Sequence, residues 1–306
     1  MPITLIENMR AAFYAPFYAA AALGAYEAEH LEIDIKTSPN AARTMQTLIS
    51  GGGDVSWGGP LRLMEAREKH PAREPIVFCE VVGRDPFFLI GGEKNARFRV
   101  ADLVGTRLAV TTEVPTPWLC LQHDLRLAGV DPASIELGPA RTMAENATAL
   151  RAGEVDVIQV FMPFAQELIE SGAGHIWYAA ASRGPTAYTS LNTTREFAGA
   201  HSEVLHAMCR AIYRTQKWIA SHDGAALAHA IASYFPDLPQ SLLARAYDEY
   251  LRIGLWNTTP IQSDDGLIWL REAGRAGGYL TQSPRYEDVV DMRFAEEAVR
   301  GDPPSM

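Results

Sequence analysis

The pattern LxxGxxDV occurs twice in this chain, as Leu48-Ile-Ser-Gly51-Gly-Gly-Asp54-Val55 and as Leu150-Arg-Ala-Gly153-Glu-Val-Asp156-Val157. Each copy follows the tetrapeptide Ala-Arg-Thr-Met, at residues 42–45 and 140–143, and precedes a short apolar run and a proline. A match of four letters can arise by chance, but the same order of elements around it predicts two copies of one structural plan.

Upstream of each copy, the sequence predicts a helix that ends at a glycine and is followed by a strand. In the first copy these are residues 17–23, Gly24 and residues 31–35; in the second they are residues 118–128, Gly129 and residues 134–137. Glycine just past a helix end adopts the left-handed conformation that other residues resist. Strands that alternate with helices at this spacing predict parallel βαβ units.

Downstream, each copy ends in an apolar strand and an Arg-x-Pro segment. Residues 75–82 lead to Arg84-Asp85-Pro86, and residues 176–181 lead to Arg183-Gly184-Pro185. We interpret the segments after these prolines as two crossings between lobes, because paired crossings form a hinge that closes around a ligand. The prediction is a first lobe of residues 1–91 and 188–306, a second lobe of residues 92–187, and a ligand cleft between them.

The expected fold class is therefore α/β, with two lobes that each contain a mostly parallel sheet flanked by helices. Apolar residues recur at helical spacing after about residue 196. We expect four helices there that cover the first lobe, over residues 201–219, 242–253, 265–276 and 286–299.

Composition narrows the classes of partner. The chain has 306 residues, 47% of them hydrophobic and 21% charged, and a formal net charge of −10. Such a chain folds into a globular protein, and nucleic acid or an anionic membrane would repel it on average. No apolar run is long enough to span a bilayer. The expected partner is a small molecule, with neither nucleic acid nor membrane insertion.

Cysteine usage and the first residues bear on location and metal binding. Cys79, Cys120 and Cys209 are odd in number, and no Cys/His metal spacing is present, so we expect free thiols, no metal and no cofactor. Met1 stands almost on the strand predicted at residues 3–6, and Arg10 interrupts the opening twenty residues. These features favour a cytoplasmic protein, or a periplasmic one whose signal peptide has been removed.

Four prolines, at positions 16, 60, 117 and 163, open predicted helices that follow strands. These helix N-termini should gather at the carboxyl ends of the strands, where α/β sheets bind ligands and free N–H groups favour anions. The candidate ligand-binding residues are those beside these prolines and the Arg-x-Pro segments: Asn8, Arg10, Phe13, Tyr14, Trp57, Gly58, Gly59, Arg62, Arg84, Thr111, Thr112, Thr116, Phe161, Met162 and Tyr188.

These residue types suit a small anionic ligand with a flat portion. The glycines permit close approach of a backbone, and the aromatic side chains suit a ring. Each arginine can offer a fork to a carboxylate or a sulfonate. The alternatives are tight turns for the glycines, packing beneath helices for the aromatic residues, and surface ion pairs for the arginines.

Two residues are candidates for catalysis. Cys120 falls in the first turn of the helix opened by Pro117, where the helix N-terminus would lower the thiol pKa. Glu113, in the preceding loop, would act as a general base if closure of the cleft desolvated it. The alternatives are a buried cysteine that only fills space and a solvated loop carboxylate.

The segment Ala15-Pro16-Phe17-Tyr18-Ala19-Ala20, together with Gly24 and residues 31–35, resembles the opening of the nitrate, sulfonate and thiamine-precursor family of binding proteins. Residues 48–60 and 103–132 are similar to later landmarks of that family. The resemblance covers about two thirds of the chain and implies the type II fold of periplasmic binding proteins. Most relatives deliver a solute to an ABC transporter, and a minority are cytosolic enzymes on the same scaffold.

Two functions follow from this resemblance. The favoured hypothesis is a cytoplasmic hydrolase or lyase without a metal, which would desulfurise, remove sulfide from, or decarboxylate a small anionic heterocycle. No catalytic motif of the family is complete, since the loop at residues 10–14 lacks a desulfinase-like cysteine and the cysteine-rich motif of the pyrimidine synthases is absent. The alternative is an ABC-transporter solute-binding protein for a sulfonate, nitrate or pyrimidine precursor, with the permease as its partner.

Overall fold

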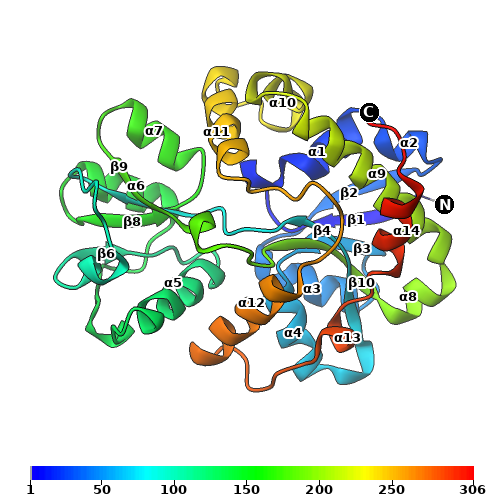
Figure 1. The fold of residues 1–306 in the computed structure, drawn as a ribbon, viewed down its shortest axis with the longest axis horizontal. Helices are drawn as coiled ribbons and strands as arrows, with labels where there is room; N and C mark the ends of the chain where they lie inside the picture. The colour runs from blue at the N-terminus through cyan, green and yellow to red at the C-terminus, as the bar shows by residue number, and fades with distance from the viewer. Residues whose placement is uncertain (1) are drawn as a thin grey trace.

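The computed structural model describes residues 2–306 and contains two five-stranded sheets, one in each lobe (Figure 1). The first sheet has the order β2-β1-β3-β10-β4 and the second has the order β7-β6-β8-β5-β9. The strands are β1 (Ile3–Glu7), β2 (Ile33–Thr37), β3 (Val55–Gly58), β4 (Pro75–Val82), β5 (Phe88–Gly91), β6 (Arg107–Ala109), β7 (Glu136–Leu137), β8 (Val157–Val160), β9 (His175–Ala179) and β10 (Thr189–Thr194).

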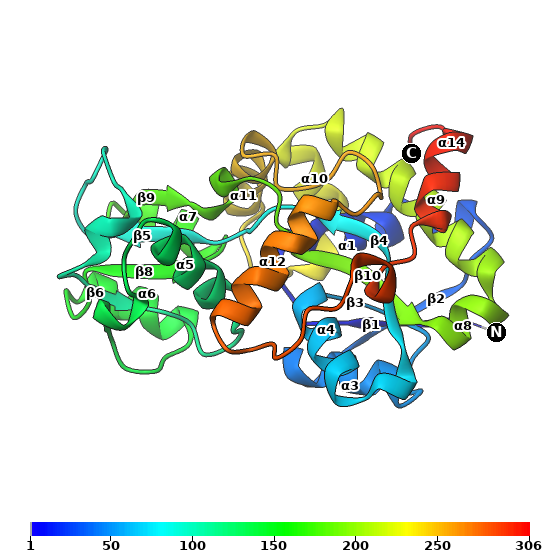
Figure 2. The same ribbon diagram turned by 60° about the horizontal axis from the view of Figure 1, so that its bottom comes forward.

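The two sheets repeat one topology, which confirms the two-lobed α/β fold. In the first sheet β1 pairs in parallel with β2 and β3, and in the second β6 pairs in parallel with β7 and β8. Each sheet also holds one antiparallel strand, β10 between β3 and β4, and β5 between β8 and β9. That strand is supplied in each case by the chain arriving from the other lobe, as Figure 2 shows.

This exchange of strands corrects one boundary. The sequence predicts that the first lobe extends to residue 91, but β5 pairs with strands of the second sheet. The first crossing therefore lies between Val82 and Phe88. An apolar strand of four buried residues fits either sheet by composition, so the sequence pattern could not assign it.

The LxxGxxDV pattern has the same role in both lobes. The Asp54 carboxylate accepts the backbone N–H of Thr4 at 2.8 Å, and the Asp156 carboxylate accepts that of Arg107 at 2.8 Å. Each aspartate thereby joins the start of the third parallel strand to the start of the first. Because an N–H at a strand end otherwise lacks a partner, this contact fixes the register of the neighbouring strand.

The Ala-Arg-Thr-Met match is not structurally equivalent. In the first lobe it lies inside α3 (Ala41–Ile49), whereas in the second Thr142 is the N-cap of α6 (Met143–Arg151) and only its methionine is helical. Both helices are followed by a left-handed glycine, with φ of 81° at Gly51 and 70° at Gly153. The duplication therefore resides in the helix end and the aspartate, and the tetrapeptide match arose by chance.

The other helices flank the sheets or cover the first lobe. The predicted helix at residues 286–299 is interrupted and forms two helices. The remaining bounds are α1 (Ala15–Ala22), α2 (Ala25–Ala28), α4 (Pro60–Lys69), α5 (Thr116–Leu127), α7 (Phe164–Glu170), α8 (Arg195–Ala200), α9 (Ser202–Ala220), α10 (Gly224–Ala230), α11 (Gln240–Arg252), α12 (Asp264–Ala276), α13 (Tyr286–Val289) and α14 (Arg293–Gly301).

Two of the C-terminal helices also contact the second lobe. On one side of the molecule α12 packs against α5, and on the other α11 packs against α7 (Figures 1 and 2). Arg245 of α11 pairs with Glu170 of α7 at 2.5 Å, and Leu119 of α5 lies against Gly277 just past α12. The expectation that these helices only cover the first lobe is therefore incomplete, because they also hold the lobes together.

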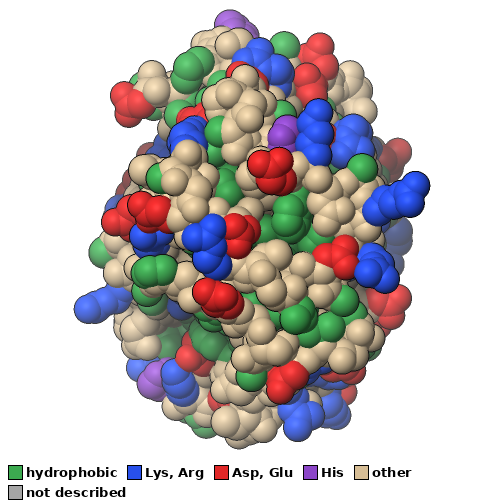
Figure 3. Space-filling view, turned by 90° about the vertical axis from the view of Figure 1, so that its left-hand side faces the viewer, with side chains coloured by type: hydrophobic (Ala, Val, Ile, Leu, Met, Phe, Trp, Pro, Cys, Tyr) green, Lys and Arg blue, Asp and Glu red, His purple; other side chains and the backbone are tan. Residues whose placement is uncertain are grey.

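Figure 3 looks onto the second-lobe end of the molecule, where acidic and basic side chains are intermixed. Among residues 2–306, no helix is both long enough and apolar enough to cross a bilayer.

Candidate functional site

A cavity of about 30 Å³ lies between the lobes, at the carboxyl ends of the parallel strands. That volume accommodates about one water molecule, so a larger ligand enters only if the lobes move apart. Its lining comes from the segments after β1, β3 and β6 and from both crossings: Asn8, Met9, Phe13, Tyr14, Gly59, Arg62, Phe87, Val114, Thr116 and Tyr188.

This lining includes part of the predicted set. Asn8, Phe13, Tyr14, Gly59, Arg62, Thr116 and Tyr188 meet at the cavity, although they come from distant parts of the sequence. Sequence reasoning missed three lining residues, namely Met9, Phe87 and Val114. Phe87 directly follows the first Arg-x-Pro segment, and this position could have indicated that it lines the cavity. Met9 and Val114 carry no chemical feature that distinguishes them from core residues.

Aromatic rings form one wall of the cavity. The ring of Phe13 lies 4.2 Å from that of Tyr14 and 6.0 Å from that of Tyr188, measured between centroids. Phe161 packs edge-on behind this wall, 5.1 Å from Phe13 and 5.2 Å from Phe87. Phe161 therefore supports the wall without lining the cavity, and rings that line a cavity suit a flat ligand once the lobes open.

Two predicted residues at the end of β3 lie outside the lining. Trp57 is fully buried and stacks on Phe17 of α1, with 4.9 Å between ring centroids, so its structure matches the alternative of packing beneath a helix. Gly58 is part of β3 and pairs with β10. The next residue, Gly59, does line the cavity, and a Cβ added there would lie 3.2 Å from the Tyr188 carbonyl oxygen.

The three candidate arginines differ in whether they are free to bind an anion. Arg10 donates to both carboxylate oxygens of Glu7, at 2.8 and 3.0 Å, and Arg84 donates to the Ala181 carbonyl oxygen at 2.9 Å. Within residues 2–306, the guanidinium of Arg62 has neither a hydrogen bond nor an ion pair, and it is half-buried at the cavity. Arg62 is thus the cation that the cleft offers to a ligand.

Two tyrosines that line the cavity carry neutral phenols. Burial raises the pKa of Tyr14 to about 12, although Asn8, which donates to its hydroxyl oxygen at 3.0 Å, and Arg62 act in the opposite direction. Burial likewise raises the pKa of Tyr188 well above its usual range. Both hydroxyl groups therefore stay protonated at neutral pH and can donate to an anion.

The remaining predicted binding residues hold loops together outside the lining. Thr112 donates to the Arg141 carbonyl oxygen at 3.1 Å. The backbone N–H of Met162 donates to the Tyr250 hydroxyl at 3.0 Å, which links the second lobe to α11. Thr111, the last of this group, donates to Glu113.

The geometry of Glu113 differs from that expected of a general base. Its carboxylate accepts the Thr111 hydroxyl at 2.8 Å and the backbone N–H of Met143 at 2.8 Å, at the start of α6. The residue is exposed, so the desolvation on which the catalytic hypothesis depends is missing in this arrangement. Glu113 joins its loop to α6 and does not line the cavity.

The thiol of Cys120 also differs from the prediction. We expected the N-terminus of α5 to lower its pKa, but the side chain is completely buried and burial raises the pKa well above its usual range. A buried thiol in low dielectric disfavours the thiolate more than one turn of helix can favour it. Cys120 is therefore protonated, as the space-filling alternative requires.

All three cysteines are buried, which predicts that their thiols do not react with reagents in solution. We expect Ellman's reagent to leave Cys79, Cys120 and Cys209 unreacted in the native protein and to modify all of them after denaturation in guanidinium, because only the exposed thiolate reacts. A rapidly reacting thiol in the native protein that disappears in Cys120→Ala would contradict this assignment and restore Cys120 as a candidate nucleophile.

The described part of the chain contains no evident cluster of metal-binding side chains. Among residues 2–306, no three or more His, Cys, Asp or Glu side chains group so as to hold a metal ion.

Comparison with known proteins places this architecture in a family. The sequence model described as "NMT1/THI5 like" matches residues 12–226, which is more than half of the chain. The chain belongs to the NMT1/THI5-like family. This membership confirms the resemblance inferred from residues 15–24 and 31–35. The sequence is also similar to that of YtlA from Bacillus subtilis (strain 168), which is provisionally named a binding protein. The two are 24% identical over 298 residues, which cover 96% of this chain and 89% of YtlA.

Solved structures share the fold of this NMT1/THI5-like protein. The periplasmic aliphatic sulphonate binding protein SsuA from Escherichia coli superposes with a TM-score of 0.76 at 15% identity, covering 93% of this chain and 94% of SsuA. The desulfurization enzyme DSZB superposes with a TM-score of 0.70 at 14% identity, covering 98% and 100%. At these identities the likeness concerns the fold alone, and it includes both a binding protein and an enzyme.

Proposed function

We propose that this protein is a solute-binding protein that closes its two lobes around a small anionic molecule with a flat portion and delivers it to an ABC transporter. The observation that carries the proposal is Arg62, a guanidinium without a protein partner in residues 2–306, which lines a cavity between the lobes together with two tyrosines whose phenols are protonated. A cation that is partly removed from water usually has a protein partner. An unpaired one in a closing cleft is suited to a ligand that brings the negative charge.

The backbone around Arg62 supports an anionic ligand. Gly59 is the N-cap of α4, a helix of ten residues, and Arg62 lies in its first turn. The first N–H groups of a helix have no partner within it, and the helix dipole places partial positive charge there. Pro60 has no N–H, and the Arg62 N–H donates to the Gly59 carbonyl oxygen at 3.1 Å. A carboxylate or sulfonate near Gly59 would therefore receive the Leu61 N–H and the Arg62 fork together, within the favourable field of the helix dipole.

Of the two hypotheses, an enzyme and a solute-binding protein, the environments of the candidate residues favour the solute-binding protein. The residues expected to react do not have the required environments, because Glu113 is solvated and Cys120 is buried and protonated. YtlA is provisionally named a binding protein and SsuA is a periplasmic aliphatic sulphonate binding protein, which supports transport, whereas the enzyme hypothesis rests on the fold likeness to DSZB. Delivery to a permease would place the protein outside the cytoplasm, in the periplasm or its equivalent, and not in the cytoplasm as first expected.

A matched pair of ligands tests the charge requirement. We expect benzenesulfonate at about 100 times its dissociation constant to stabilise the protein by roughly 2.7 kcal/mol, which raises the melting temperature by about 5 °C. Benzenesulfonamide, which has nearly the same shape and no charge, should leave the melting temperature unchanged. Thermal denaturation followed by fluorescence measures both, and equal shifts with the two compounds would exclude recognition of an anion.

A further inference from the structure

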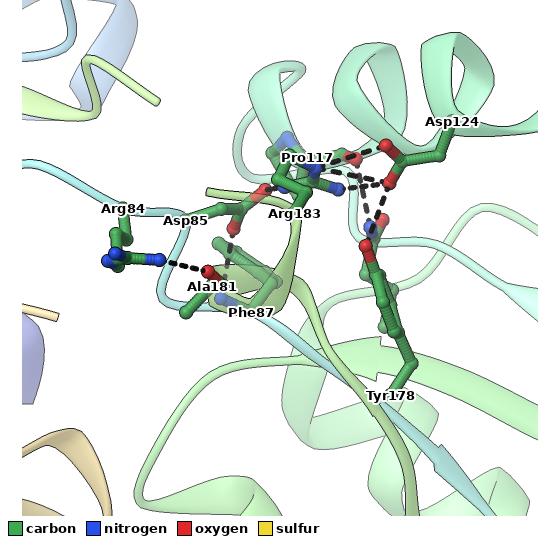
Figure 4. A network of polar contacts seen from close by, with 9 residues as sticks. Arg84, Asp85, Phe87, Pro117, Asp124, Tyr178, Ala181 and Arg183 are labelled. Atoms are coloured by element: carbon green, nitrogen blue, oxygen red, sulfur yellow. Dashed lines mark hydrogen bonds and ion pairs between the residues drawn. The ribbon is translucent and has the colours of Figure 1, made fainter. Parts of the chain in front are cut away.

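A buried ionic network connects the two crossings with the second lobe (Figure 4). The guanidinium of Arg183 pairs with Asp85 at 2.6 Å and with Asp124 at 2.5 Å. A second bond, from Arg183 Nε to Asp124, measures 3.1 Å. The exposed fractions of the three side chains are 4%, 0% and 9%, in the order Arg183, Asp85, Asp124. One arginine therefore neutralises a fully buried carboxylate, Asp85, and a largely buried one, Asp124.

Arg183 lies on the second crossing, between Ala179 and Thr189, and its two partners come from different segments. Asp85 lies on the first crossing and Arg183 itself on the second, while Asp124 belongs to α5 of the second lobe. The guanidinium also lies 4.8 Å from the ring centroid of Trp269, on α12. That indole also packs edge-on with His123 of α5, at 5.1 Å between ring centroids. Arg183 is consequently in contact with both crossings and with helices from either side of the cleft.

The same network reaches the ligand cavity through its acidic partners. The Asp85 carboxylate accepts the backbone N–H of Phe87 at 3.0 Å, and the Phe87 side chain lines the cavity. Asp124 is on the same helix as Thr116, which lines the cavity from the other lobe. A displacement of Arg183 would therefore shift lining residues on both crossings and on α5.

Burial makes this network sensitive to the loss of any member. Removing one partner from a buried ion pair leaves an uncompensated charge, whereas replacing all members by neutral side chains removes that penalty. Burial already raises the pKa of Asp85 despite the opposing effect of Arg183. The geometry of the hinge thus depends on a single side chain that donates to two carboxylates, and the planar fork of an arginine holds both in a fixed geometry that the ammonium of a lysine does not provide.

We propose that Arg183 is a positioning residue for ligand binding, which sets the closed arrangement of the two lobes by joining Asp85 and Asp124 across the hinge. This inference rests on the proposed solute-binding function. Arg183 acts through Phe87, Thr116 and Trp269, and it does not line the cavity itself.

The test separates positioning from folding with two variants. In the triple variant Arg183→Met, Asp85→Asn, Asp124→Asn all charge in this network is removed, so we expect the fold to be retained. We expect it to weaken benzenesulfonate binding roughly 30-fold and to give a more extended small-angle X-ray scattering profile without ligand. Arg183→Lys keeps the charge but loses the fork, and should weaken binding roughly 10-fold. The control is Arg245→Gln, which breaks the exposed pair with Glu170 between the lobes and should change affinity by less than about 5-fold.

The spectroscopic signature of the same variants is the fluorescence of Trp269. This indole contacts both Arg183 and His123, so its emission should change on ligand addition in the native protein and change less in Arg183→Lys. The difference in emission change between the native protein and Arg183→Lys should disappear when Trp269→Phe is introduced into each of them.

Several outcomes would overturn the proposal. Native affinity and native scattering in Arg183→Lys would reduce Arg183 to a contribution to stability, as would native affinity in a folded triple variant. If the triple variant fails to fold, Arg183→Lys still decides. If the unmodified protein binds no tested anion, the proposed function fails, while the scattering comparison independently shows whether Arg183 sets the arrangement of the lobes.

Discussion

Replacing Arg62 by methionine is expected to weaken anion binding roughly 100-fold, because a charge-assisted hydrogen bond in a desolvated site contributes about 1.5–3 kcal/mol. The substitution keeps the length and the apolar stem of the side chain. Among residues 2–306 the guanidinium has no partner that the change would leave unpaired, so the melting temperature of the ligand-free protein should stay the same. Isothermal titration calorimetry with benzenesulfonate measures the loss.

The control for Arg62 is Arg43→Gln, which removes an exposed positive charge from α3. It should leave the dissociation constant unchanged if the effect is local and not one of overall charge. Arg62→Lys should recover part of the affinity, since it restores the charge without the fork. Native affinity in Arg62→Met would mean that the anion binds elsewhere, and the assignment of the site would have to be abandoned.

Stability should decrease as pH rises towards 8 because of Glu80, which is buried on β4. Burial raises the pKa of its carboxyl from 4.5 to about 8, although Asn257, Ser263 and Gln262 donate to it. Between these two pH values the folded protein keeps a proton that the unfolded chain has lost. The free energy of unfolding therefore falls by about 1.4 kcal/mol for each pH unit in this window and levels off above it.

Glu80→Gln removes this titration and should flatten the dependence. We expect the variant to match the native protein near pH 5 and to melt at least about 5 °C higher at pH 9, as measured by circular dichroism over a pH series. Glu203→Gln, an exposed change on α9, controls for the loss of one negative charge. A slope in Glu80→Gln as steep as in the native protein would assign the pH dependence to another group.

The repeated sequence pattern was sufficient to predict the architecture, because its elements have local causes. Gly51 and Gly153 end helices with a positive φ, and the aspartates that follow tie neighbouring strands together. Such contacts lie within one βαβ unit, so spacing reveals them. The exchange of β5 and β10 between lobes involves partners far apart in sequence, and no local pattern specifies it.

The site was only partly predictable for a related reason. Proximity to the helix-opening prolines selected Asn8, Gly59 and Arg62, and all three line the cavity. The same rule also selected Arg10, but the positive charge of Arg10 is paired with the carboxylate of its neighbour Glu7. Which of several arginines stays free, and whether a cysteine near a helix start is exposed, depends on tertiary packing. These properties therefore required the structure.

Calorimetric titration with benzenesulfonate, followed by mass spectrometry of the recovered compound, tests the central claim most directly. The account predicts one molecule bound per chain, recovered chemically unchanged after prolonged incubation, with affinity lost in Arg62→Met. Release of sulfite or any other product from the ligand, abolished by Glu113→Gln or Cys120→Ala, would contradict it and establish an enzyme on this fold.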